Sequence, residues 1–400
     1  MHSIRACRLA AALTLVAVVA TVPDPLVAQS GALPNAPGVW KPWKPFSAIA
    51  SARQEQAATP ALVKAFEGEM LALNEILRRA SGVASPVGFS VETWGNLDGY
   101  RLAEDASGQP AGSALPLSGA LTFGAFPIYE IVRNGKTIRV DTGETALQQF
   151  HINQIRPGLI DRGNVTEWIG VDTDAFHKPM PQGEVAGLPR YGDGLIIARD
   201  PAALWTPLPQ KAALDLVAKA RQKTVSELEE SLSKSTARLA VVRDPAYRAK
   251  RIKEGLPAEA LAAEETQLAN ELSPTGGGTG KSLADAKRAL SEVTDWIAEL
   301  SPTQQAAPSC YAAKGASLRA KFQTTPSADC HPLVRPNYAY FDRALPRSAP
   351  QVVIITGTSR CFDTADKYNR DANSTSPAGC RANRALVETM DKSAIRAWLR

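Results

Sequence analysis

The sequence predicts an α+β fold. It consists of a mostly antiparallel sheet domain, an inserted antiparallel helical hairpin that resembles a coiled coil, and a disulfide-stapled C-terminal segment. Three observations lead to this prediction. Strand-like runs fill residues 87–199, a glycine-poor stretch with helical spacing fills residues 207–302, and four cysteines lie together between residues 310 and 380.

The first 28 residues have the pattern of a secretory signal peptide. Arg5 and Arg8 precede an apolar run over residues 9–22, and Ala20 and Ala28 are alternative cleavage points. The apolar run is shorter than the roughly 20 residues that a membrane-spanning helix needs. We therefore expect an exported chain, in the periplasm or the extracellular space, with no transmembrane segment after cleavage.

Residues 29–58 form a segment rich in proline and tryptophan. The run GVWKPWKPF places Trp40 and Trp43 close to prolines, which favour extended backbone in the residue before them. Two interpretations follow. The tryptophans anchor the chain to the body of the protein, which is the simpler account, or the segment is an extended arm that docks on a partner.

Residues 59–206 are predicted to form the α+β domain. A helix is expected from Thr59 or Pro60 to Ala80, with Thr59 as its cap. The later runs GFSVETW, ALTFGAF, IYEIVRNGKTIRVD and GLIIARD carry the β-branched and aromatic residues of strands. The Asn134-Gly135 pair is a strong signal for a hairpin turn.

Residues 207–302 are predicted to form the helical hairpin or a small bundle. The first helix should begin near Pro209, and the last has an apolar residue every three or four positions. Residues 238–253 hold six basic residues and one acidic residue, and residues 254–271 hold five acidic residues and no basic one, so adjacent antiparallel pieces would pair opposite charges. A basic face for an acidic partner is the alternative. The apolar seam is Leu283, Ala286, Leu290, Val293, Ile297 and Leu300.

Residues 303–400 form the tail, which we expect to pack on the α+β domain. It contains one strand, QVVIITGT, and a last helix over residues 382–399. Four cysteines allow three pairings, and we favour the two that close short loops. Their spacing does not match that of zinc sites. The favoured pairs are Cys310 with Cys330 and Cys361 with Cys380.

The stretch TGGGTGKS, residues 275–282, resembles a phosphate-binding loop but lacks its first glycine. Thr275 occupies that position, and the preceding residues are polar and helical where a buried strand is required. We interpret the stretch as a turn between helices, with Ser282 and Asp285 as a capping box and Lys281 solvated. The sequence therefore predicts no nucleotide binding.

One group of residues could support chemistry. Asp172, Asp174 and His177 lie within six residues of each other in VDTDAFH, and carboxylates with imidazole are ligands for divalent metals. His151 would be a further ligand or a general base. The alternative is that the aspartates make turn and cap hydrogen bonds and that the histidines are structural.

These observations favour a non-enzymatic interaction or structural protein. Its partner would be another protein or an envelope component, bound through the helical hairpin. The alternative is a metal-dependent hydrolase that uses Asp172, Asp174, His177 and His151. The formal net charge of +5 is small for 400 residues, so nucleic-acid binding is not expected. The sequence predicts no cofactor.

Overall fold

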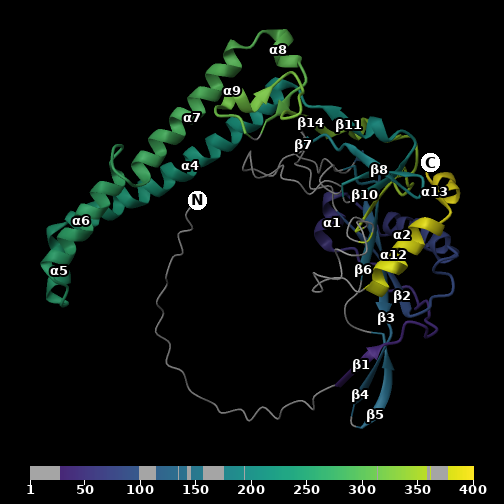
Figure 1. The fold of residues 1–400 in the computed structure, drawn as a ribbon. Coiled ribbons are helices and arrows are strands. Elements are labelled where there is room, and N and C mark those ends of the chain that lie inside the picture. Colours follow the sequence, from purple (N-terminus) through teal and green to yellow (C-terminus); the bar gives the residue numbers. More distant parts are fainter. Residues whose placement is uncertain are drawn as a thin grey trace.

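The body of the molecule is built on a seven-stranded sheet, and a long helical arm extends away from it (Figure 1). All strand pairs within this sheet are antiparallel, which confirms the predicted α+β class. Among the described residues, no helix combines the length and the apolar character needed to cross a membrane. The computed structural model describes residues 28–98, 114–133, 135–141, 146–155, 175–192, 194–312, 314–357, 361 and 377–400.

The central position in the sheet belongs to a strand from the C-terminal part of the chain. Strand β15 lies between β6 and β10, and all five of its residues are buried. A wholly buried strand of this kind needs neighbours on both sides and cover on both faces. In spatial order the strands are β2 (Phe89–Leu97), β3 (Gly119–Pro127), β6 (Ala146–Ile152), β15 (Val352–Thr356), β10 (Gly194–Ala198), β9 (Leu188–Tyr191) and β8 (Pro181–Val185).

Four helices contribute to the core on one face of the sheet. Phe66 and Leu73 of α2 pack in one buried cluster with Phe123 of β3 and Phe150 of β6. The Thr59 side chain accepts a hydrogen bond from the Leu62 amide, which confirms the predicted cap. Helix α1 lies just before α2 in the chain. The helices are α1 (Ala50–Glu55), α2 (Pro60–Arg78), α12 (Pro377–Thr389) and α13 (Lys392–Trp398).

The prediction of one continuous helix over residues 382–399 is wrong. The chain leaves the helical conformation after Thr389, and the Asp391 carboxylate accepts a hydrogen bond of 2.8 Å from the Ala394 amide. An aspartate in this position caps a new helix, so it favours two helices over one. Met390, at the break, is buried in the core.

The proline- and tryptophan-rich segment runs along the edge strand β2. It forms parallel bridges from Trp40 to Val91 and from Ser47 to Asn96. The Trp40 ring nitrogen donates a hydrogen bond of 2.7 Å to the Val83 carbonyl oxygen. These contacts support the anchoring interpretation, because the segment covers a sheet edge that would otherwise be open to pairing with other chains.

A three-stranded ribbon extends from the body at β3. Strand β4 pairs with β5 across the predicted turn, and Gly135 has a φ of +70°, the left-handed conformation that glycine adopts readily. The hairpin itself is thus confirmed, while Asn134 lies outside the described residues. The strands are β1 (Ala28–Ala32), β4 (Tyr129–Arg133) and β5 (Lys136–Val140).

A smaller sheet lies between the large sheet and the base of the arm. Successive residues of a strand face opposite sides. Val334 accordingly packs with Ile354 of the large sheet, whereas Leu333 packs with Leu214 and Val293 of the arm helices. The strands are β7 (Phe176–His177), β11 (Trp205–Pro207), β12 (Cys310–Tyr311), β13 (Phe322–Gln323) and β14 (His331–Pro336), and the 3-10 helices η3 (Pro201–Leu204) and η4 (Tyr338–Tyr340) flank them in the chain.

The arm consists of helices that lie along one another (Figure 1). Helix α4 has 34 residues, which corresponds to about 51 Å at 1.5 Å per residue. It begins just after Pro209, as predicted. The arm helices are α4 (Gln210–Arg243), α5 (Pro245–Lys253), α6 (Ala258–Leu272) and α7 (Thr279–Glu299), and α8 (Pro302–Ala306) and α9 (Leu318–Lys321) follow at the base.

Opposite charges pair along the arm. Arg238 of α4 bonds to Glu264 of α6 at 2.6 Å, and Arg243 and Arg248 both contact Glu265. The predicted pairing of the basic and acidic stretches is therefore confirmed at these positions. The side chains are largely solvated, so each pair contributes little to stability.

The predicted capping box at Ser282, in the turn TGGGTGKS, is wrong. Helix α7 begins at Thr279, three residues before the proposed cap Ser282, whose hydroxyl donates to the Gly278 carbonyl. A Cβ atom at Gly278 would lie 2.5 Å from the Cα atom of Glu271, so glycine allows the turn to lie close against α6. Lys281 is exposed, but in the first turn of α7 rather than before it.

Candidate functional site

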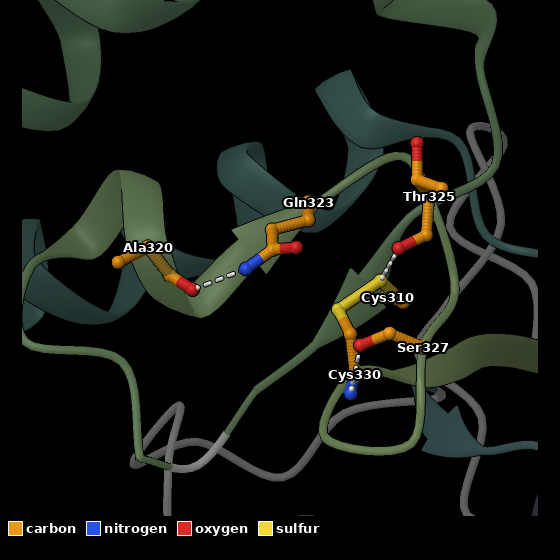
Figure 2. The surroundings of a disulfide bond; sticks show 6 residues. All are labelled: Cys310, Ala320, Gln323, Thr325, Ser327 and Cys330. Carbon is orange, nitrogen blue, oxygen red and sulfur yellow. Dashed lines mark hydrogen bonds between the residues drawn. A yellow bond between two sulfur atoms is a disulfide. The ribbon is translucent and has the colours of Figure 1, made fainter.

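A disulfide organises the small sheet at the base of the arm. Cys310 and Cys330 are bonded, with their Cα atoms 5.4 Å apart. In Figure 2 the Cys330 amide donates to the Ser327 hydroxyl at 3.2 Å, and the Thr325 carbonyl oxygen lies 3.4 Å from the sulfur of Cys310. The bond holds β12 against β14 and so fixes the positions of the residues that follow each cysteine.

The second disulfide joins Cys361 to Cys380, with Cα atoms 4.9 Å apart. Both pairs are the short-loop pairs favoured from the sequence. Disulfides form and persist in oxidising compartments.

A cleft of about 490 Å³ opens beside the first disulfide, between the arm helices and α9. This volume is within the range of about 300–1,000 Å³ that is usual for small-molecule sites. One part of its wall is apolar, formed by Val217, Leu318 and Phe322. The full lining is Val217, Ala220, Arg221, Thr224, Glu292, Tyr311, Ala316, Ser317, Leu318, Lys321 and Phe322.

Three charged residues line the cleft. Arg221 of α4 donates to the Ala289 carbonyl of α7, and its guanidinium lies 3.8 Å from the Glu292 carboxylate. Lys321 of α9 has no carboxylate partner among the described residues. The cleft therefore has two cations, one of which is not neutralised by a salt bridge.

Tyr311 connects the cleft to a pair of histidines. Its ring lies 6.0 Å from that of His177 and 5.2 Å from that of Phe322. The rings of His177 and His331 are 5.6 Å apart. Burial raises the pKa of the Tyr311 hydroxyl, so it stays protonated at neutral pH. Of the residues proposed from the sequence, His177 lies beside this cleft.

His151 lies on a different sheet from His177. It is on β6 of the large sheet, where its Nε2 atom is 2.9 Å from the Thr356 hydroxyl. Burial lowers its pKa to about 4, and the charge of Asp98 and the Gln154 side chain oppose this only in part. The imidazole is therefore neutral at physiological pH.

The proposed metal ligands Asp172 and Asp174 lie outside the described residues. Within the described ranges, no group of three or more histidine, cysteine, aspartate and glutamate side chains is placed to hold a metal ion. His177 and His331 are a pair, with Tyr311 as their neighbour.

Several residues in and beside the cleft were not proposed from the sequence. Tyr311 and His331 each follow a disulfide cysteine, and that adjacency was a usable signal for a rigid site. Arg221 and Lys321 are separated by 100 positions (321 − 221), and no local pattern connects them. Only the packing of α9 beside the arm brings them to one cleft.

Comparison of this chain with family models, with curated proteins and with solved structures finds no match. The site must therefore be interpreted from its own geometry.

Proposed function

We propose that the protein is an exported, non-enzymatic interaction protein of the periplasm or extracellular space. The predicted signal peptide and the two disulfides support the compartment. The helical arm supports the role, because it presents a long surface at a distance from the body (Figure 1).

The observation that carries the proposal is how little of the outer arm is buried. Helix α5 has no buried residue, and α6 has one, Leu261. The outer arm buries a narrow apolar seam of its own, and none of its residues belongs to the buried clusters of the body, so this part of the arm adds little to the stability of the body. The seam is Val225, Leu239, Val242, Leu261 and Leu283. Contact with a partner explains the length of the arm, and the proposed antiparallel, coiled-coil-like hairpin is the form in which it would act.

The tip of the arm is the proposed contact surface. Ile252 of α5 is 47% exposed, and Val241 near the end of α4 is 44% exposed. Basic side chains of α5, including Lys250 and Lys253, surround this region. An exposed apolar residue with a polar rim is typical of protein interfaces.

Site-specific crosslinking tests this proposal. A photoreactive phenylalanine analogue is placed at Ile252, or at Val87 as a body control that is 55% exposed, and illuminated in the cells that export the protein. We expect a discrete adduct from the tip and not from the control. No adduct at Ile252, or the same adducts from both sites, would contradict the proposal.

The metal-dependent hydrolase remains a second candidate because His177 lies beside His331. In this alternative Asp172, Asp174 and His151 would assist. Two imidazoles on one zinc ion, each at a Zn–N distance of about 2.0–2.1 Å, bring their ring centres to roughly 5 Å, close to the observed spacing. Titration with zinc ions tests it: tight binding that is lost in His177→Ala supports the hydrolase, and no binding removes it.

A further inference from the structure

The cleft at the base of the arm has the structure of a ligand site that is separate from the tip. Its walls come from α4, α7, β12 and the segment from Ala316 to Phe322. The disulfide between Cys310 and Cys330 and the buried ring of Tyr311 make one wall rigid. Pre-formed walls reduce the entropy that binding would cost.

The two cations of the cleft have different roles. Arg221 joins α4 to α7 through a hydrogen bond to the Ala289 carbonyl and an ion pair with Glu292, so its charge already has a partner. Lys321 is partly exposed as a residue and, among the described residues, its ammonium has neither a salt bridge nor a side-chain hydrogen bond. An ammonium in this state gains from an anionic ligand.

The charge of the lining indicates the charge of the ligand. Arg221 and Lys321 contribute two positive charges and Glu292 one negative charge, which leaves a net charge of +1. A single negative charge balances this, whereas a dianionic phosphate would place a second charge near the Glu292 carboxylate. Most of the lining surface is polar, and Val217, Leu318 and Phe322 add a smaller apolar patch against which a compact apolar body could pack.

We propose that this cleft binds a small monoanionic carboxylate with an aromatic or other apolar body. The carboxylate pairs with Lys321, and the apolar body packs against Leu318 and Phe322. The site joins α4 and α7 to α9, so a bound ligand contacts both the arm and the body. The inference does not depend on contact at the tip.

Calorimetric titration of the disulfide-intact mature chain tests the proposal. The probes are 2-naphthoate, its neutral analogue 2-naphthylmethanol, and the dianion 2-naphthyl phosphate. Two variants change the cleft: Lys321→Met removes the charge, and Ala316→Trp fills the space. Lys64→Met removes an exposed lysine of α2 and serves as the control.

We expect 2-naphthoate to bind, and the neutral analogue to bind about tenfold more weakly or worse, as expected for loss of a charged hydrogen bond. Lys321→Met should weaken 2-naphthoate binding to the same extent, Ala316→Trp should abolish it, and Lys64→Met should leave it unchanged. Each variant is first shown to keep the thermal unfolding midpoint of the parent chain.

Three results would overturn the proposal. The first is no binding of 2-naphthoate at millimolar concentration. The second is binding that neither Lys321→Met nor Ala316→Trp reduces. The third is tighter binding of 2-naphthyl phosphate than of 2-naphthoate, which would contradict the monoanion.

Discussion

The seven-stranded sheet and the helical arm are stabilised by different means. All five residues of β15 are buried, whereas α5 has no buried residue. The sheet depends on burial of apolar surface. The outer arm has a narrow apolar seam that includes Val242 and Leu261, together with solvated ion pairs such as that of Arg238 with Glu264. Under the proposed function, stability and partner contact would therefore be separated within one chain.

The largest expected effect is in the body. Phe150 of β6 is fully buried, and Phe150→Ala should lower the free energy of unfolding by about 3–5 kcal/mol. Val241→Ala in the arm, at 44% exposure, is the matched control and should change it by less than about 0.5 kcal/mol. Urea unfolding measures both. Equal effects would contradict the contrast between the two regions.

The disulfide of the small sheet should have the next largest effect. Replacing Cys310 and Cys330 together by serine releases a loop with a sequence separation of 20. The expected loss is about 3 kcal/mol, because the open chain gains conformational entropy. Thermal unfolding measures it, and 2-naphthoate binding should fall as well. An unchanged midpoint would show that packing alone holds this wall.

His151 should make the stability of the body depend on pH. An unfolded imidazole binds a proton below a pKa of about 6.5, whereas the folded one does so only near a pKa of about 4. Between these values the unfolded state holds more protons, so stability falls as the pH falls. The loss should approach roughly 2–3 kcal/mol at pH 4.

His151→Gln provides the comparison for this prediction. The variant should lose less stability than the parent chain between pH 7 and pH 4, as measured by urea unfolding at each pH. Identical pH profiles for the two proteins would show that His151 is not held neutral.

The smallest expected effect is in the arm. A double-mutant cycle on Arg238 and Glu264, each changed to alanine, should give a coupling of about 0.2–1 kcal/mol. Raising the salt concentration to 1 M should remove most of it. A coupling above about 2 kcal/mol would show that the arm is not held together by surface pairs of ordinary strength.

Local features of the fold could be predicted from the sequence. The Thr59 cap, the β4–β5 hairpin and the short-loop disulfides each depend on residues close together in the chain. The start of α7 at Thr279 was missed because the residue before it, Gly278, has no capping side chain. Glycine is needed there because the backbone lies close to Glu271 of α6. The break at Asp391 had a local signal, a capping residue, which the apolar pattern obscured.

The sheet order and the cleft could not be predicted in this way. Nothing local places β15 between β6 and β10. The cleft depends on Arg221, Tyr311 and Lys321, which meet through the packing of α9 near α4. Long-range packing decides both, and the periodicity of a single sequence does not record it.

A chain with a shortened arm tests the central claim most directly. The Lys287 ammonium lies 2.8 Å from the Glu229 carboxylate, so residues 230–286 can be replaced by a short glycine-rich loop without separating α4 from α7. The full and shortened chains are then compared by thermal unfolding and by chemical crosslinking in the cells that produce the protein. We predict an unchanged unfolding midpoint for the body and loss of the partner adduct. A shortened chain that cannot fold would contradict the claim that the body is stable without the arm. A shortened chain that keeps its partner would contradict the proposal that the arm is the contact surface.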